Sequence, residues 1–260
     1  TLTTSSAASD VYKRQTTGNF PHNPEPLPEN LIEISKKVVD TNADLGIVVD
    51  PDVDRLALVC EDGSMFGEEY TLVSVADYVL SKTPGNTVSN LSSTRALSDV
   101  TNKHNGNYFA SAVGEVNVVE KMKDKNAVIG GEGNGGIIYP ALHYGRDALV
   151  GIALFLTNLA EKEISCKSLR KTYPNYFISK NKIDLDLSVD IAKLLKTLES
   201  KFSFNNINTI DGLKINFDDG WVHLRRSNTE PIIRIYSESV TLDKANQLAE
   251  DFISQIKELL

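Results

Sequence analysis

The sequence predicts an α/β fold built on a mostly parallel sheet, followed by a small separate α+β domain. Two observations support this fold class. Before the stretch YPNYFISKNKIDLD, short apolar runs alternate with stretches whose apolar residues recur at helical spacing. That alternation is typical of a parallel sheet connected by helices. After it, the pattern changes to one amphipathic helix, a run of strands broken by Asp-Gly turns, and a last long helix.

The composition restricts the class of protein. The 260 residues include 41% hydrophobic residues, which is ordinary for a globular chain, and the net charge of -8 argues against a nucleic-acid binder. The longest strongly apolar stretch is too short to span a bilayer, so no membrane partner is expected. Cys60 and Cys166 match no metal or redox spacing, and two unpaired thiols suit a reducing compartment, so we expect a cytoplasmic protein. The composition gives no oligomeric state.

The first third of the chain contains one helical pattern and two expected strands. Residues 1–15 have neither an apolar signal-peptide core nor a period, so we expect a non-native or disordered leader there. The spacing in Leu31–Val39 predicts a helix. The run DLGIVVD (44–50) is continuous and rich in β-branched residues and is expected as a short buried strand, and RLALVC (55–60) is expected as its neighbour.

The next hundred residues repeat a strand–helix rhythm. Strands are expected at NTVSNLS, NYFASAV and AVIGGE, and helices at 68–82, 94–104, 115–125 and 146–162. The last of these helices has apolar residues at Leu149, Ile152, Ala153 and Leu156. In the tail, a helix is expected over 188–202, strands over 209–239, and a final helix over 241–260 with a single apolar stripe.

Three aspartates follow the first predicted strand. Asp50, Asp52 and Asp54 alternate in VVDPDVDRLALV, and Arg55 comes next. Crowded carboxylates at a strand end repel one another, and a divalent cation such as Mg²⁺ removes that penalty. A polar turn is the plain alternative. An EF-hand loop is excluded, because Arg55 stands at its glycine position and strands replace its helices. We favour a Mg²⁺ site for phosphoryl transfer, with Arg55 near the phosphoryl oxygens.

Two further motifs indicate ligand binding. Gly130–Gly136 has five glycines in seven residues, and its Glu132 and Asn134 suit neighbouring sugar hydroxyls; a tight turn after a strand is an equal alternative. In RRSNTEPIIR, Arg225 can bind a phosphate through two parallel bonds, and Ser227, Asn228 and Thr229 favour an anion-binding loop over a plain exposed turn.

In this order the three motifs resemble those of the α-D-phosphohexomutase superfamily, which includes phosphomannomutase, phosphoglucomutase and phosphoglucosamine mutase. The metal loop resembles 50–55, the sugar-specificity loop 131–135 and the phosphate loop 225–231. GNFPHNPEPLPENL and VGEVNVVEKM are also similar. The resemblance runs from about Gly18 to the C-terminus.

The resemblance implies a fold, a cofactor and a reaction. Family members have four domains around a deep cleft, and three aspartates and a phosphoserine hold Mg²⁺. The phosphoserine gives its phosphoryl group to a hexose phosphate, and the other phosphate of the resulting bisphosphate returns to the serine. Residues 16–64 would then be the end of domain 2, 65–180 domain 3, and 184–260 domain 4.

Site roles follow from the same resemblance, motif by motif. Asp50, Asp52 and Asp54 would be metal ligands, and Arg55 would contact the phosphoryl group. Glu132 and Asn134 would hold the sugar hydroxyls of a hexose phosphate. The phosphate that is not transferring would be held by Arg225, Ser227, Asn228 and Thr229.

Two departures from the family pattern matter. Asn134 stands where the family has Ser or Thr and Gly136 where His is common, so both a phosphoglucosamine and a phosphomannose substrate stay open. The chain also lacks the Thr-Ala-Ser-His-Asn-Pro segment of the nucleophile; in FPHNP, Pro21 stands where the serine would be. We therefore expect a truncated chain that binds Mg²⁺ weakly and has no mutase activity alone.

Two rivals remain. A haloacid-dehalogenase-like phosphatase also ends a strand with Asp-x-Asp, as Asp50 and Asp52 do, but leaves the glycine loop and RSNTEP unexplained. A non-catalytic sugar-phosphate binding fragment would use the two loops without transferring a phosphoryl group.

Overall fold

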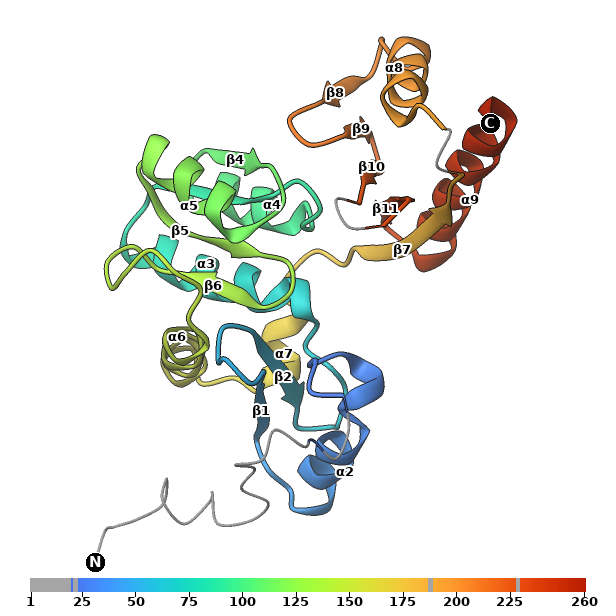
Figure 1. The fold of residues 1–260 in the computed structure, drawn as a ribbon. Coiled ribbons are helices and arrows are strands. Elements are labelled where there is room, and N and C mark those ends of the chain that lie inside the picture. The colour runs from blue at the N-terminus through green and yellow to red at the C-terminus, as the bar shows by residue number, and fades with distance from the viewer. Residues whose placement is uncertain (1–19, 21–22, 187–188, 228–229) are drawn as a thin grey trace, which may run out of the picture.

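The computed structural model describes residues 20, 23–186, 189–227 and 230–260. The predicted leader, 1–15, lies outside these residues. The chain forms three successive parts: a two-stranded N-terminal part, a central α/β layer, and a C-terminal α+β domain (Figure 1). The predicted fold class is confirmed. None of the helices in the described ranges has the length and apolar character that crossing a membrane requires.

The N-terminal part is a helix beside a β-hairpin. Its elements are η1 (Pro28–Asn30), α2 (Ile32–Asp40), β1 (Leu45–Val49) and β2 (Leu56–Cys60). β1 and β2 are antiparallel, with Leu45 opposite Cys60. The expected neighbouring strand is present as β2, which is buried along its whole length. The expectation of a buried β1 was wrong: Ile47 is 38% exposed, because within the described residues β1 pairs with β2 alone.

The central layer contains a four-stranded sheet in the order β4-β3-β5-β6. β3 runs parallel to both β4 and β5, and β6 returns antiparallel to β5, so the predicted mostly parallel sheet is confirmed. The strands are β3 (Asn86–Asn90), β4 (Tyr108–Ser111), β5 (Ala127–Glu132) and β6 (Gly136–Ile138). The helices are α3 (Glu68–Lys82), α4 (Ala96–Lys103), α5 (Glu115–Asp124), α6 (Ala148–Lys162) and α7 (Cys166–Arg170).

Helices cover both faces of this sheet. On one face, Ile129 of β5 shares a core with α3, α4, α6 and the buried strand β2. On the other face, Val88 packs with Val118 and Met122 of α5. Two parallel connections of this kind place the carboxyl ends of β3, β4 and β5 along one edge, where α/β proteins usually bind ligands.

The C-terminal domain is an antiparallel sheet in the order β7-β11-β10-β9-β8, packed on two helices. Its elements are β7 (Phe177–Asp184), α8 (Ile191–Lys201), β8 (Asn206–Asn208), β9 (Leu213–Phe217), β10 (Gly220–Arg226), β11 (Ile232–Ser239) and α9 (Leu242–Leu259). The predicted stripe on α9 is confirmed, since Ala245, Ala249, Phe252 and Ile256 are buried. β7 begins at Phe177, so the boundary predicted at 180–184 falls inside a strand of this sheet.

Candidate functional site

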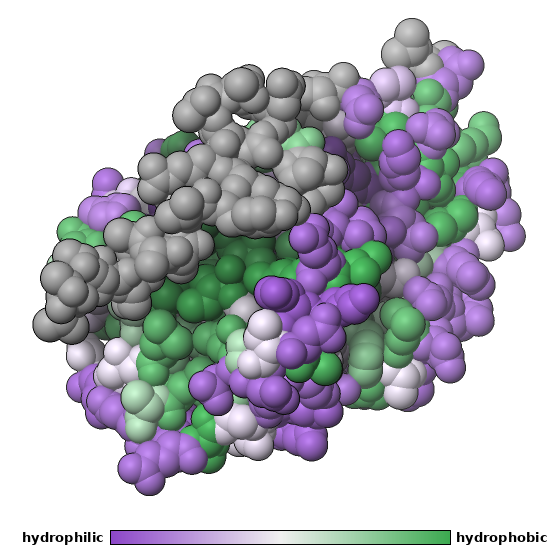
Figure 2. All heavy atoms as spheres, turned by 90° about the horizontal axis from the view of Figure 1, so that it is seen from below, coloured by the Kyte–Doolittle hydropathy of each residue, from purple (hydrophilic) through white to green (hydrophobic). Residues whose placement is uncertain are grey.

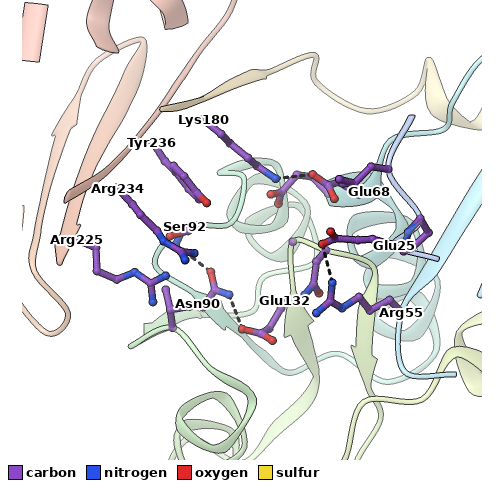
Figure 3. A pocket seen from close by; sticks show the side chains of 16 residues that line it. Glu25, Arg55, Glu68, Asn90, Ser92, Glu132, Lys180, Arg225, Arg234 and Tyr236 are labelled. Carbon is purple, nitrogen blue, oxygen red and sulfur yellow. Dashed lines mark hydrogen bonds and ion pairs between the residues drawn. The ribbon is translucent and has the colours of Figure 1, made fainter. Parts of the chain in front are cut away.

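A cavity of about 250 Å³ lies where the three parts of the chain meet. Figure 3 shows side chains from the N-terminal part, the central layer and the C-terminal sheet converging on it. The residues lining it include members of all three predicted loops: Arg55, then Glu132, Gly133 and Asn134, then Arg225. They also include residues outside the predicted set: Glu25, Glu68, Glu69, Asn90, Ser92, Lys180, Arg234 and Tyr236.

The three aspartates form a compact cluster at the turn between β1 and β2. Each of Asp50, Asp52 and Asp54 offers an oxygen, and these oxygens lie within 4.8 Å of one another. Asp50 is buried, and its Oδ1 accepts hydrogen bonds from the backbone N–H groups of Asp54 (3.0 Å) and Arg55 (2.9 Å). Val53 has a φ of 60°, which closes the turn. The loop therefore folds around the first aspartate.

The donor set of this cluster fits a hard divalent cation. All three side chains offer oxygen, which Mg²⁺ and Ca²⁺ prefer. Oδ1 of Asp54 is buried without a hydrogen-bond partner, and such an orphaned acceptor is costly unless something positive contacts it. The arrangement is therefore able to hold a metal ion through Asp50, Asp52 and Asp54.

Arg55 lies between the aspartate cluster and the cavity. Its Nη1 contacts Oε1 of Glu25 at 3.2 Å, while its Nε is 3.7 Å from Asp50 Oδ2 and 3.8 Å from Asp54 Oδ1. The last two distances exceed normal hydrogen bonds, and this buried Nε has no hydrogen-bond partner. Arg55 is thus a cation in the cavity wall with capacity for a further anionic partner.

Glu132 ends β5 and is held by three donors. Its Oε1 accepts from Asn90 Nδ2 (2.8 Å) and the amide of Gly114 (3.2 Å), and its Oε2 accepts from Arg146 Nη1 (2.8 Å). The carboxylate is buried yet fully paired. Asn134 lines the cavity as well, with its Oδ1 accepting from the amide of Gly136 at 3.2 Å.

The glycines of this loop are required by close approaches. Gly135 has a φ of +83°, and a Cβ there would lie 2.2 Å from the carbonyl oxygen of Leu56. A Cβ at Gly133 would lie 2.1 Å from Oε2 of Glu69. The loop can therefore press against β2 only because Gly135 carries no side chain, while a side chain at Gly133 would displace the carboxylate of Glu69.

Arg146 connects the metal loop to the sugar loop, and sequence reasoning assigned it no role. Its guanidinium contacts Asp54 Oδ2 and Glu132 Oε2, and its Nε lies 3.5 Å from Glu115 Oε2. Burial alone would lower the pKa of Arg146, but these carboxylates raise it. One fixed cation thus compensates acidic side chains from both loops.

The C-terminal sheet presents cations to the cavity. Arg225 on β10 stands directly opposite Arg234 on β11, and both line the cavity. Like charges directly opposite one another on a sheet are destabilising, so this pairing is favourable only with an anion between or beside them. Arg225 has an acidic neighbour, Asp211 Oδ2, at 3.6 Å. Lys180 of β7 adds a third cation, paired with Glu68 at 2.5 Å.

The rest of the predicted phosphate loop is partly described. Ser227 is buried, and its amide donates to the carbonyl oxygen of Ile232 at 3.0 Å. Asn228 and Thr229 lie outside the described residues. Arg234 was inside the quoted motif but was not assigned a role; only the β10–β11 register brings it beside Arg225.

Glu69 is an ionisable group that the sequence did not single out. Desolvation raises the pKa of its carboxyl to about 8, although the amide of Thr94 donates to Oε2 at 2.9 Å. At neutral pH this side chain is therefore mostly protonated and able to donate a hydrogen bond within the cavity. It is the second residue of α3, a position that gave no reason to expect a cavity.

The chain matches models of one protein family along most of its length. These are the phosphoglucomutase/phosphomannomutase models: alpha/beta/alpha domain II at residues 6–63, alpha/beta/alpha domain III at 67–176, and the C-terminal domain at 181–255.

Curated relatives carry related names. A probable phosphoglucosamine mutase of Methanopyrus kandleri is 32% identical over 244 residues, covering 92% of this chain and 54% of that protein. A phosphoglucomutase/phosphomannomutase of Thermococcus kodakarensis is 35% identical and covers 94% of this chain and 54% of that protein. The chain spans about half the length of these relatives.

Solved structures share the fold. A phosphoglucomutase/phosphomannomutase family protein of Burkholderia thailandensis aligns with a TM-score of 0.80 at 28% identity, covering 93% of this chain and 53% of that one. A putative phosphomannomutase of Thermus thermophilus aligns with a TM-score of 0.73 at 22% identity, covering 91% of this chain and 51% of that one.

Proposed function

The chain belongs to the phosphoglucomutase/phosphomannomutase family, and from that premise we propose that it serves to move a phosphoryl group between two positions of a hexose phosphate. One observation supports this most directly. Three loops that are far apart in the sequence, at 50–55, 131–135 and 225–231, contribute residues to or beside a single cavity of about 250 Å³. Positioning and charge neutralisation supply most of the catalysis of phosphoryl transfer.

In this proposal the acidic turn is the cofactor site. Asp50, Asp52 and Asp54 would hold Mg²⁺, which when bound neutralises charge on the phosphoryl oxygens. Arg55 points its guanidinium into the cavity wall and would contact the same oxygens. Arg146 contacts Asp54 directly and so fixes the direction of its carboxylate.

The sugar and the second phosphate would bind on either side of Asn90. Glu132 and Asn134 would accept or donate hydrogen bonds to sugar hydroxyls. Arg225, with Ser227, Asn228 and Thr229, would hold the phosphate that is not being transferred, and Arg234 adds a second guanidinium beside Arg225. Two opposed guanidinium groups suit a dianion better than one does.

The names of the relatives support a proposal for the hexose. Relatives of comparable similarity are named phosphoglucosamine mutase and phosphoglucomutase/phosphomannomutase, so we propose a phosphoglucosamine or a phosphomannose substrate. Asn134 occupies the variable position of the sugar loop, and its Oδ1 is engaged by the amide of Gly136. Its amide hydrogens are the part able to reach a hydroxyl.

The nucleophile is not within these 260 residues. They contain no Ser-His-Asn-Pro segment, so the phosphoserine of the proposed reaction would have to come from sequence outside them. The 260-residue chain itself would then bind hexose phosphates without turning them over, which coincides with the rival proposal of a non-catalytic binding fragment. A haloacid-dehalogenase-like phosphatase is disfavoured, because it gives the opposed Arg225 and Arg234 no role.

Binding of hexose phosphates tests the proposal. We expect calorimetry to detect binding of glucosamine and mannose phosphates to the 260-residue chain. Arg225→Gln should weaken it roughly tenfold or more, because a charged hydrogen bond to phosphate is lost. Arg226→Gln is the matched control, since Arg226 is exposed and does not line the cavity. Equal affinities of the two variants, or no binding by the wild type, would contradict the proposal.

A further inference from the structure

The hydroxyl group of Ser92 is held by a histidine from another part of the chain. Ser92 follows β3 and lies in the cavity wall (Figure 3). Its Oγ is 2.9 Å from Nδ1 of His223 on β10, and the Nε2 of the same ring is 2.6 Å from the backbone carbonyl oxygen of Asp211. His223 is 2% exposed.

The partners of the ring determine its tautomer. A carbonyl oxygen can only accept, so Nε2 must carry the hydrogen in the bond to Asp211. A neutral imidazole then has an acceptor at Nδ1, and the hydroxyl of Ser92 must donate to it. Neutrality follows from the surroundings: burial lowers the pKa of His223 to about 4, with Lys214 and Arg225 adding to the effect and Asp211 opposing it.

These hydrogen bonds fix the direction in which the Ser92 hydroxyl donates. A free hydroxyl can turn to donate or to accept, but the only hydrogen of Ser92 Oγ points at His223. Lone pairs are all that it can offer to the cavity. Its neighbour Asn90 is occupied in holding the loop, with Oδ1 accepting from the amide of Ser92 at 3.0 Å and Nδ2 donating to Glu132.

We propose that Ser92 is a specificity-determining residue that accepts a hydrogen bond from one hydroxyl of the bound sugar, with His223 as the positioning residue that makes it an acceptor only. The inference rests on the proposed function, since it requires a hexose phosphate in the cavity. A phosphate dianion cannot donate, so Ser92 selects for the hydroxyl-bearing part of the ligand. Arg225 and Arg234 select for the phosphate.

Because His223 belongs to the C-terminal domain, the acceptor role of Ser92 depends on how that domain packs against the central layer. Lys214 Nζ donates to the carbonyl oxygen of Leu91 at 2.7 Å, next to Ser92. Oδ2 of Asp211 accepts from the amide of Val113 at 3.0 Å, at the end of the adjacent strand. Without this docking, Ser92 would regain a rotating hydroxyl and lose its preference for a donor.

The tautomer can be measured without a variant. Two-bond proton–nitrogen correlation spectra of the imidazole side chains distinguish the three protonation states of His223 in the intact chain. We expect the neutral form with hydrogen on Nε2 at pH 7. The other neutral tautomer, or a doubly protonated ring, would overturn the inference.

Fluorinated sugars test the acceptor role directly. Fluorine cannot donate, so we would titrate the 1-phosphates of glucosamine and mannose, with fluorine replacing one ring hydroxyl at a time. One analogue should bind the wild type roughly three- to tenfold more weakly than its parent, the loss of one neutral hydrogen bond. Ser92→Ala should abolish that difference. Ser98→Ala, a serine of α4 outside this cavity, should keep it.

The outcomes separate the two levels of the proposal. Parent sugar phosphates that do not bind at all would overturn the proposed function, and this inference with it. Parents that bind normally while no analogue shows a loss that depends on Ser92 would overturn this inference alone. His223→Leu should reduce the discrimination, because the freed hydroxyl can then turn toward the fluorine.

Discussion

At the scale of single residues, Arg146 explains how three crowded carboxylates coexist beside the cavity. It contacts Asp54 of the metal loop and Glu132 of the sugar loop, and approaches Glu115. The sequence identified Asp54 from its spacing and Glu132 from the glycine-rich loop, whereas Glu115 and Arg146 were expected only as the first residues of two helices. A partner that is ninety residues distant becomes visible only when the chain is folded.

The metal proposal gives a prediction at Asp54. Asp54→Asn removes one charged oxygen from the cluster, so the affinity for Mg²⁺ should fall about tenfold or more, because ligand charge sets cation affinity. Calorimetric or NMR titration with Mg²⁺ alone measures this. Asp44→Asn, which removes the same charge from an exposed position outside the cluster, is the control. A similar affinity for both variants would refute the assignment.

His223 predicts how stability depends on pH. Its pKa is about 4 in the folded chain and near 6.5 when unfolded. Between these values the unfolded state binds more protons, so stability contributed by the neutral ring is present above pH 6.5 and is lost as pH falls toward 4. Relative to His223→Gln, the wild type should lose about 2 kcal/mol between pH 7 and pH 5.

Denaturant unfolding at several pH values measures that difference. His143→Gln is the matched control, because the His143 side chain is 49% exposed. Parallel pH curves for the wild type and His223→Gln would show that the buried ring titrates normally, and the tautomer inferred above would then lack its physical basis.

At the scale of elements, the positions of helices and strands followed from periodicity, while their exposure did not. The helix expected over 146–162 is present as α6, yet Leu149 is 65% and Leu156 41% exposed. α6 instead buries a face of small residues and Phe155 against β2 and β6, because Gly151 permits a close approach to Leu56 and Ile137. Figure 2 shows apolar side chains gathered on the face seen from below.

The sugar loop and β2 form one packing unit, which Gly135 makes possible. The amide of Leu56 donates to the carbonyl oxygen of Gly135 at 3.2 Å. Gly135→Ala should destabilise the protein by about 3 kcal/mol, since it combines a positive φ with a backbone collision. Thermal unfolding measures this. Gly145→Ala should change stability little, because its Cβ would meet the side chain of His143 at 3.2 Å and that of Glu115 at 3.7 Å, with no backbone atom among these neighbours.

A small effect of Gly135→Ala would mean that the loop can shift away from β2. Composition alone identified this loop, since five glycines in seven residues are unusual. The sequence could not show which glycines are constrained. That depends on the neighbour that each Cα meets, which is β2 for Gly135 and Glu69 for Gly133.

At the scale of the whole molecule, the sequence predicted the three loops but only some of the residues that line the cavity between them. Residues with unusual spacing or composition stood out, whereas Ser92, Arg234 and Lys180 occupy ordinary strand or loop positions. Their role depends on strand register and on how the C-terminal domain docks. Both depend on contacts between distant parts of the chain, which local patterns do not encode.

Because these 260 residues contain no Ser-His-Asn-Pro segment, we predict that the chain alone has no mutase activity. The purified 260-residue chain should bind hexose phosphates and show no conversion of one hexose phosphate into its isomer, even with Mg²⁺ and a hexose bisphosphate present. A coupled assay or phosphorus NMR measures turnover. Conversion above the buffer rate that disappears in Asp54→Asn would show that the chain carries its own nucleophile.

The short connection into β7 affects what happens when the central layer and the C-terminal sheet move apart at the cavity. α7 of the central layer ends at Arg170 and β7 of the C-terminal sheet begins at Phe177, so residues 171–176 alone connect the two bodies (Figure 1). A short tether keeps tethered groups at a high effective concentration, in the millimolar range for flexible joints. When the polar contacts between the two bodies break, Lys180, Arg225 and Arg234 therefore stay close to the rest of the cavity. Re-closure is then a fast, intramolecular event.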